Sequence, residues 1–280
     1  MLAHMPDTSA RPEIGETIEA AGIATNYLHG GNGAPVVLLH GSGPGVTAYA
    51  NWRLTIPVLS QRFSVFAPDL VGFGFTERPD DIDYSLDTWV SQVVGFLDAL
   101  GLERVALVGN SFGGALALRL AARHPERVSK LVLMGSVGVP FVITDGLDRV
   151  WGYEPSFESM RDLIGIFAHS RELVSDELAQ VRYEASIQPG FQESFAAMFP
   201  APRQRWVDAM VTPDDEIARL PHPTLVVHGR EDRVIPLSNA LHLLEVVPDV
   251  RLHVFGRCGH WTQIEHADAF GRLVLDFLTS

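Results

Sequence analysis

The chain has 280 residues, 46% of them hydrophobic, which is enough for one large core with an inserted lobe. Its 34 acidic residues outnumber its 21 basic ones and give a formal net charge of -13, which argues against nucleic acid and anionic membrane surfaces as partners. A single cysteine permits no internal disulfide, and neither a signal peptide nor an apolar run of membrane-spanning length is found, so we expect a cytoplasmic protein.

The first half of the chain alternates short apolar runs with amphipathic stretches. Residues 14–28 alternate loosely and predict an antiparallel hairpin at a sheet edge. A short helix is expected to carry Asn51-Trp52-Arg53 and to end near Pro57. Buried strands are expected at residues 35–39, 63–68, 105–108 and 128–134, and helices at 86–100 and from Phe112 to Pro125. This alternation predicts an α/β fold with a mostly parallel sheet and helices on both faces.

The alternation stops at residue 136 and resumes near residue 211. Helical stretches are expected at 157–167, 175–186 and 191–198, and strands return at 224–227 and 251–255. An all-helical insertion inside an α/β pattern is best explained as a lid over the strand ends, which would exclude water. We therefore expect a core of residues 1–135 and 211–280, with a helical cap of residues 136–210 between its two parts.

A candidate nucleophile lies at the joint between one of these strands and its helix. Gly109-Asn110-Ser111-Phe112-Gly113 satisfies the pattern Gly-x-Ser-x-Gly in the strand-turn-helix context that the motif requires. Such a tight turn forces strained backbone angles on Ser111, so its neighbours must lack bulk. The following helix would direct free N–H groups and its positive dipole end toward an oxyanion beside Ser111.

Two later strand ends supply an acid and a base. Asp232 follows the strand at 224–227, and His260 follows the strand at 251–255, which gives the chain order serine, acid, histidine. His260 would take the Ser111 proton, while Asp232 would fix the tautomer of the imidazole. Glu231 is a rival acid that we expect to be solvent-exposed, and Asp69 is a rival that we expect to brace a turn.

The remaining histidines and the cysteine are weighed against structural roles. His40, His228 and His253 adjoin strands and are expected to be hydrogen-bonded structural residues, whereas His124, His222, His242 and His266 are expected at the surface. Cys258 precedes Gly259-His260 and is expected to be packed in a turn rather than to act as a nucleophile. No cluster has metal-ligand spacing, so no metal or other cofactor is expected.

A glycine-rich loop follows the strand at 35–39. His40-Gly41-Ser42-Gly43-Pro44-Gly45 lacks the spacing of a phosphate-binding loop and fits an oxyanion loop better. The N–H groups of Ser42 and Phe112 would hold the developing negative charge. Asn51 lies where this loop faces the site, and either a substrate contact or a local capping role would explain it.

With these residues assembled, the chain resembles the α/β-hydrolase superfamily and, more narrowly, the meta-cleavage product hydrolases of aromatic catabolism. The resemblance covers nearly the whole chain. It is carried by HGSGPGVTAYANWRLTIP, DLVGFGFTERP, GNSFGG, WGYEPSFESM, RYEASIQPGFQESFAAMFPAPRQRW, HGREDRVIPL and HVFGRCGHWTQIEHA. The cap segments matter most, because cap sequence varies freely among α/β hydrolases.

The resemblance implies hydrolysis of a carbon-carbon bond in a small anionic dienoate. Such an enzyme would convert 2-hydroxymuconate semialdehyde, or an analogue with a small 6-alkyl group, to 2-hydroxypenta-2,4-dienoate and a short carboxylic acid. Arg182 would bind the substrate carboxylate, with Asn51, Asn110 and Trp261 near the 2-oxo dienoate part. A salt bridge with Glu184 or Glu177 is the alternative for Arg182, and core packing is the alternative for Trp261.

Other features are left open at this stage. We expect the distal wall of the pocket to be formed by Phe141, Leu147, Trp151, Val207, Val234 and Ile235, whose bulk would favour hydrogen or methyl over phenyl. A carboxylesterase on the same triad, or a small-molecule receptor with a hydrolase fold, is an alternative function. The route, through an acyl-Ser111 or a gem-diol, is open, and so is self-association into a homo-oligomer.

Overall fold

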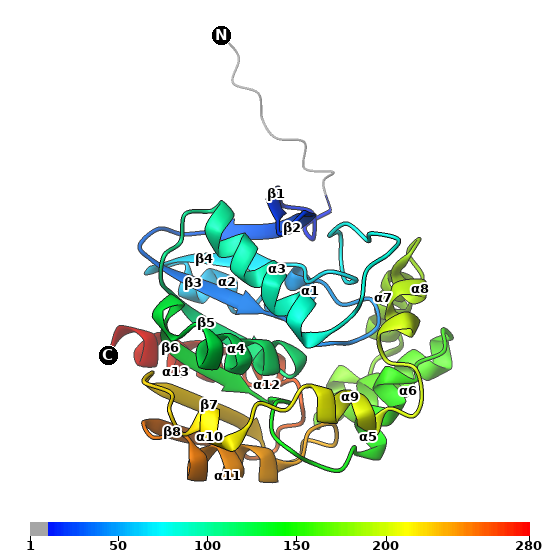
Figure 1. Ribbon diagram of the computed structural model, residues 1–280. Coiled ribbons are helices and arrows are strands. Elements are labelled where there is room, and N and C mark those ends of the chain that lie inside the picture. Colours follow the sequence, from blue (N-terminus) through cyan, green and yellow to red (C-terminus); the bar gives the residue numbers. More distant parts are fainter. Residues whose placement is uncertain (1–10) are drawn as a thin grey trace.

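The computed structural model describes residues 11–280 as one eight-stranded sheet with helices on both faces (Figure 1). The strand order is β1-β2-β4-β3-β5-β6-β7-β8, and all pairings from β4 to β8 are parallel. The first two strands pair antiparallel at one edge, as residues 14–28 predict. The strands are β1 Glu16–Ala20, β2 Ile23–Gly30, β3 Ala34–Leu39, β4 Phe63–Pro68, β5 Val105–Asn110, β6 Val128–Met134, β7 Thr224–Gly229 and β8 Val250–Phe255.

Both faces of the sheet are buried, because side chains along a strand alternate between its two sides. In β3, Val37 and Leu39 join one apolar core, whereas Val36 and Leu38 join a second core on the opposite face. The first core includes residues of α3 Leu86–Ala99, α4 Phe112–Arg123 and α11 Leu237–Val246. The second includes residues of α1 Ala48–Trp52, α2 Ile56–Leu59 and α13 Ala267–Thr279. Continuous apolar runs, rather than alternating ones, are therefore what the sequence shows for these strands.

Local signals place most helix ends where the sequence predicts them. The Ser85 hydroxyl accepts a hydrogen bond from Thr88 N at the start of α3, and Gly101, with φ of +65°, follows its end. One prediction was wrong: α1 ends at Trp52, and a second helix, α2, begins at Ile56. Pro57 does not end a helix but lies in the first turn of α2, where its missing N–H is not needed.

Six α-helices lie between β6 and β7, and the first five of them, α5 to α9, gather at one end of the sheet (Figure 1). Three of them, α6 Phe157–Phe167, α7 Asp176–Ser186 and α8 Phe191–Met198, match the predicted ranges to within one residue. The other two, α5 Asp145–Trp151 and α9 Gln204–Ala209, were not predicted, because each spans only two turns and lacks a long apolar pattern. The segment begins after the carboxyl end of β6, so its helices adjoin the edge where the parallel strands end.

Candidate active site

Ser111 occupies a strained turn between β5 and α4. Its φ of 54° and ψ of -112° lie in a region that non-glycine residues rarely adopt, at a cost of about 1–3 kcal/mol. Ser111 N donates to Met134 O over 2.8 Å, which holds the turn against β6. A Cβ added to Gly109 would come within 2.4 Å of Gly113 O, so no larger residue fits there. The turn therefore displays the Ser111 side chain at the carboxyl end of the sheet.

Asp232 and His260 form a buried hydrogen-bonded pair. His260 Nδ1 lies 2.7 Å from Asp232 Oδ2, and the two side chains are only 4% and 1% exposed. The other carboxylate oxygen of Asp232 accepts hydrogen bonds from Val234 N at 2.7 Å and Ile235 N at 2.9 Å. Burial raises the pKa of Asp232, but the charge and hydrogen bond of His260 outweigh it and hold this pKa below its ordinary value. An ionised Asp232 fixes the proton on Nδ1 and leaves Nε2 of His260 available as a base.

A second histidine lies behind the acid. His228 Nε2 is 3.0 Å from Ile235 O and 3.6 Å from Asp232 Oδ2. A carbonyl oxygen can only accept, so Nε2 of His228 carries the hydrogen. Burial lowers the pKa of His228, which keeps the ring neutral and gives it the structural role that was predicted.

The remaining histidines are partly as expected. His40 Nδ1 lies 2.9 Å from Gly41 O and its Nε2 accepts from Leu70 N, while burial lowers its pKa to about 4. The prediction for His222 was wrong: this residue is 1% exposed rather than at the surface. It lies two residues before the buried strand β7, with Pro223 between them.

The glycine-rich loop after β3 lies directly against the elbow at Ser111. A Cβ on Gly41 would be 3.4 Å from Ser111 Cβ. Asn51 Oδ1 accepts from both Gly41 N, at 3.2 Å, and Asn110 Nδ2, at 2.8 Å, and so joins α1 to the loop and to the elbow. Thr47, not Asn51, caps α1, which disfavours the capping explanation for Asn51. The buried atoms Asn51 Nδ2 and Asn110 Oδ1 have no hydrogen-bond partner within residues 11–280.

Ser42 and Phe112, the residues predicted to supply the oxyanion N–H groups, lie in the glycine-rich loop after β3 and at the start of α4. Phe112 is the first residue of α4, and the first N–H groups of a helix have no partner within it. Ser42 lines the same cavity as Ser111. The Ser42 hydroxyl is engaged elsewhere, since it accepts a 2.9 Å hydrogen bond from Trp151 Nε1. This bond gives the Ser42 hydroxyl a structural role as the acceptor for a side chain of α5.

A narrow cavity of about 40 Å³ joins most of these groups. Ser111 and His260 line it together, so the predicted nucleophile and the predicted base border one space. Of the residues predicted to contact substrate, Asn51, Asn110, Arg182 and Trp261 all line this cavity. The rest of the lining consists of Gly41, Ser42, Gly43, Val46, Leu147, Val150, Phe167 and Val234.

The structure brings two of the six residues predicted for the distal wall to this cavity. Leu147 and Val234 line the cavity, whereas Phe141, Trp151, Val207 and Ile235 are not among its lining residues. The Trp151 indole instead stacks on Phe199, with ring centroids 4.3 Å apart, and Val207 is fully buried in the core. The backbone of Ile235 serves Asp232. Val150 on the two-turn helix α5 and Phe167 at the end of α6, which were not predicted for the wall, line the cavity instead.

Arg182 extends from α7 toward the cavity. Its Nη2 donates to Pro44 O over 3.1 Å, and among residues 11–280 it has no salt bridge with Glu177 or Glu184. Glu184 instead accepts from Gln180 at 2.8 Å. Although the residue as a whole is partly exposed, burial of its guanidinium lowers the pKa to about 10, so Arg182 stays charged at neutral pH.

Two neighbours of the site escaped sequence reasoning. Phe167 O accepts a 2.7 Å hydrogen bond from His260 N, and the Phe167 ring stacks on Trp261 with centroids 4.9 Å apart. Gln263 is 2% exposed, its Oε1 has no partner in the described chain, and it lies beside Trp261 and Asn51 in an adjoining cavity. The only signal in the sequence was a polar residue two positions after Trp261.

The rival acid Glu231 and the thiol of Cys258 both have structural roles. Glu231 was expected to be exposed, but only 26% of its side chain is, because its carboxylate accepts from Cys258 N at 2.9 Å and pairs with Arg230. Cys258 is fully buried, and burial raises its pKa to about 12, so the thiolate is not available as a nucleophile.

Asp69 braces a turn, as predicted. Its carboxylate accepts hydrogen bonds from Ala48 N at 2.6 Å, Phe75 N at 2.8 Å and Asn26 Nδ2 at 2.8 Å. Burial raises its pKa to about 6 despite these donors. Asp69 therefore fixes the start of α1, on which Asn51 lies.

Within residues 11–280, no group of three or more His, Cys, Asp or Glu is arranged to hold a metal ion, and no helix has the length and apolar character needed to cross a membrane.

Comparison with known proteins agrees with this geometry. The family model of the alpha/beta hydrolase fold matches residues 34–267. A 2-hydroxymuconate semialdehyde hydrolase of Pseudomonas sp. (strain CF600) is 62% identical over 95% of this chain and 94% of that protein. A 2-hydroxy-6-oxo-2,4-heptadienoate hydrolase of Pseudomonas putida is 60% identical over 98% of this chain and 99% of that protein. The chain belongs to the meta-cleavage product hydrolases of the alpha/beta hydrolase family.

Solved structures support the same membership. A meta-cleavage product hydrolase from Pseudomonas fluorescens IP01, a serine-to-alanine mutant complexed with acetates, superposes with a TM-score of 0.95. It is 59% identical, and the match covers 96% of this chain and 99% of that one. The expected α/β-hydrolase fold is thereby confirmed, and the chain is a hydrolase.

Proposed function

We propose that this meta-cleavage product hydrolase adds water across a carbon-carbon bond of a ring-fission dienoate, with 2-hydroxymuconate semialdehyde or its 6-methyl analogue as substrate. The products are 2-hydroxypenta-2,4-dienoate and formate or acetate. The observation that carries the proposal is the buried pair of Asp232 and His260, 2.7 Å apart, at a cavity shared with Ser111 and an arginine that has no acidic partner in the described chain. The 60–62% identical relatives are named for these two substrates.

Each polar group of the cavity has a part in the proposed reaction. Arg182 binds the substrate carboxylate, for which a guanidinium fork has matching geometry. The partnerless Asn51 Nδ2 and Asn110 Oδ1 offer a donor and an acceptor to the 2-oxo dienoate part. Trp261 packs on the planar dienoate chain from the side of Phe167. These contacts orient the bond to be broken over Ser111.

The acid-base step uses His260. Its Nε2 takes the proton of the attacking hydroxyl group while Asp232 stabilises the imidazolium, and the proton then goes to the dienoate carbon that leaves. The N–H groups of Ser42 and Phe112 stabilise the oxyanion, and loss of such a donor typically costs a factor of about 100 to 1,000 in rate. An acyl-Ser111 route and a gem-diol route place these same residues in the same roles. Among the described residues no hydrogen bond joins Ser111 Oγ to His260, whose imidazole is bonded to Asp232, and catalytic hydrogen bonds often tighten only in the complex with substrate.

The wall residues set the size of the 6-substituent. Leu147, Val150, Phe167 and Val234 close the narrow cavity with apolar groups. A hydrogen or methyl group fits this wall better than a phenyl ring. We also propose that the helices α5 to α9 form a cap that closes over the bound dienoate. The enzyme is proposed to be cytoplasmic and to form a homo-oligomer.

The proposal is tested by adding the purified protein to a catechol ring-fission product and following the yellow dienolate absorbance. Loss of absorbance with stoichiometric formate or acetate supports the proposal, and Ser111→Ala, with matched folding by circular dichroism, should abolish it. Turnover of an activated ester serves as the comparison. A kcat/KM for the ester above that for every dienoate would identify a carboxylesterase and overturn the proposal.

A further inference from the structure

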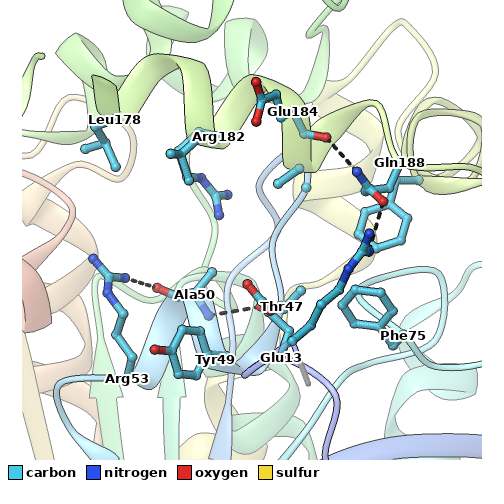
Figure 2. Close-up of a pocket in the computed structure, with 15 residues that line it drawn as sticks. Glu13, Thr47, Tyr49, Ala50, Arg53, Phe75, Leu178, Arg182, Glu184 and Gln188 are labelled. Carbon is cyan, nitrogen blue, oxygen red and sulfur yellow. Dashed lines mark hydrogen bonds between the residues drawn. The ribbon is translucent and has the colours of Figure 1, made fainter. Parts of the chain in front are cut away.

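A second, larger pocket opens at the surface between α1 and α7. It has a volume of about 380 Å³, and Figure 2 shows its polar groups between the two helices. Arg53 and Arg182 extend into this space from opposite sides (Figure 2). Apolar groups from Leu178, Phe75 and Phe191 complete its walls.

This outer pocket and the cavity at Ser111 are separated by a third, intermediate cavity that shares lining residues with each of them. Ala50, Arg53, Leu178 and Arg182 also line an intermediate cavity of about 70 Å³. Val46, Asn51, Trp261 and Arg182 line both this intermediate cavity and the inner cavity that contains Ser111. Arg182 therefore borders all three spaces, and Arg53 borders the outer two.

The two arginines are held by carbonyl groups, not by acids. Arg53 Nη1 donates to Ala50 O over 2.6 Å, and Arg182 Nη2 donates to Pro44 O over 3.1 Å. Neither guanidinium lies within 4.0 Å of a carboxylate oxygen in the part of the chain that the structure describes. Both keep unused N–H donors, since a guanidinium has five.

Other charges at the pocket do not cancel this pair. Glu184 lines the pocket, but its carboxylate accepts from Gln180 and points away from Arg182 in Figure 2. Glu13 also lines it, opposite Arg11, whose Nη1 donates to Gln188 Oε1. The repulsion from Arg53 lowers the pKa of Arg182 more than the attraction of Glu13 raises it. Two cations thus line one pocket, and neither forms an ion pair with a carboxylate in the described part of the chain.

Polar atoms without partners continue along the inner part of this series of pockets. Gln263 Oε1 in the intermediate cavity and Asn51 Nδ2 at its junction with the inner cavity are buried and unsatisfied. An unpaired buried polar atom costs about 1–3 kcal/mol, so such atoms mark places where a polar ligand or water is bound. The three pockets therefore form a series from the surface to Ser111, and its inner two members contain buried polar atoms without partners.

We propose that the outer pocket is an anion-binding vestibule in which Arg53 binds the carboxylate of an incoming small organic acid and transfers it to Arg182. The ligand class rests on the proposed function, because the dienoate substrate is such an acid. The vestibule answers a physical problem: with a net charge of -13, the protein as a whole repels its own substrate. A local pair of cations at the mouth reverses the field where the substrate approaches.

The vestibule is tested by association kinetics in a background that cannot turn the substrate over. In Ser111→Ala, binding of the yellow dienoate is followed by stopped-flow quenching of tryptophan fluorescence, since Trp261 lines the inner cavity. Arg53→Gln should lower the association rate constant about three- to tenfold at low salt and flatten its dependence on ionic strength. Arg53→Lys should keep most of the rate, because it keeps the charge. In the Ser111-containing enzyme, Arg53→Gln should lower kcat/KM and leave kcat unchanged.

The matched control is Arg219→Gln, which removes the same charge from an exposed pair with Asp215 on α10 Asp214–Ile217. It should leave the association rate unchanged, which excludes an effect of net charge alone. An unchanged rate in Arg53→Gln, or an equal loss in Arg53→Lys, would overturn the vestibule while dienoate hydrolysis stands. Absence of both dienoate binding in Ser111→Ala and dienoate turnover in the wild type would instead overturn the proposed function.

Discussion

The indole N–H of Trp151 donates a 2.9 Å hydrogen bond to the hydroxyl of Ser42. This contact joins α5, in the helical segment between β6 and β7, to the glycine-rich loop that follows β3. The backbone N–H of the same serine is proposed to stabilise the oxyanion. The position of this N–H therefore depends on a side chain from the proposed cap, which sequence reasoning placed in the distal wall.

Replacing Trp151 by Phe removes this hydrogen bond and keeps the aromatic stack on Phe199. We expect kcat to fall about three- to tenfold, in line with the net free energy of one hydrogen bond, with a small change in KM. Steady-state kinetics on the dienoate measure it. Trp206→Phe is the control, because it removes an indole bond to Pro200 O at an exposed position. Equal losses in both variants would contradict the role of Trp151.

Replacing Asp232 by Asn should lower kcat by about 10⁴, because the amide favours the wrong tautomer of His260. Folding holds the pKa of Asp232 below its ordinary value, so its contribution to stability is present above the ordinary pKa and is lost as pH falls through the lowered one. Urea unfolding between pH 3 and 7 should therefore show a weaker acid dependence in this variant. Asp215→Asn, at an exposed ion pair, should change neither kcat nor the acid dependence.

His40 should make the stability of the protein depend on pH in a higher range than Asp232 does. Burial lowers its pKa to about 4, so folding favours the neutral ring. The stabilisation is complete above about pH 6.5 and is lost progressively as pH falls toward 4, to an extent of about 3 kcal/mol. In His40→Gln the free energy of unfolding should fall less over this interval, although the variant is less stable at pH 7.5.

Asp69 opposes this effect, because burial raises its pKa to about 6 and its ionisation lowers stability as pH rises from about 4 to 6. The comparison of His40→Gln with the wild type at each pH cancels the Asp69 contribution. Parallel stability curves for the two proteins would show that His40 is not the titrating group.

Cys258 should be inert in the folded protein. Complete burial and a pKa raised to about 12 predict no reaction with an aromatic disulfide reagent at pH 8, and full reaction after unfolding in urea. Cys258→Ala should keep the activity within about twofold. Rapid labelling of the folded protein with loss of activity would revive the thiol as a participant.

Shortening the apolar wall should change substrate preference. Leu147→Ala enlarges the inner cavity and is expected to raise the ratio of kcat/KM for the 6-phenyl substrate over the 6-methyl one about tenfold, a value typical for small changes in an apolar pocket. Leu163→Ala removes an equally buried leucine of α6 that does not line the cavity, and it should leave this ratio unchanged. A fast 6-phenyl turnover by the wild type would contradict the size argument.

The sequence predicts the sheet well and places the three residues of the candidate triad after strands, because both features depend on local patterns. Buried parallel strands are continuous apolar runs, and Ser111, Asp232 and His260 each lie in the turn or loop that follows one of the strands. The roles of these residues stay predictions, while the structure shows Asp232 and His260 in contact. Helices α5 and α9 were missed because a short helix is stabilised by tertiary packing, which leaves little periodicity in the sequence.

Contacts between distant segments were the hardest to predict. The direction of the side chain decides whether a residue contacts the site, as it does for Gln263, Trp151 and Phe167. The spacing of residues in the sequence does not show which way an indole or an amide points. The same limit explains the error at Ile235, whose backbone rather than side chain serves the site. It also explains the error at His222, which is buried although it lies outside the strand that follows it.

The 2.7 Å bond from His260 N to Phe167 O ties the backbone of the base to the last residue of α6. Grafting the helical segment of a relative onto this chain would therefore replace one of the two hydrogen-bond partners that hold His260, the other being Asp232. A graft that ends before Phe167 would keep this hydrogen bond to His260, whereas a graft that extends past Phe167 would change specificity and turnover together.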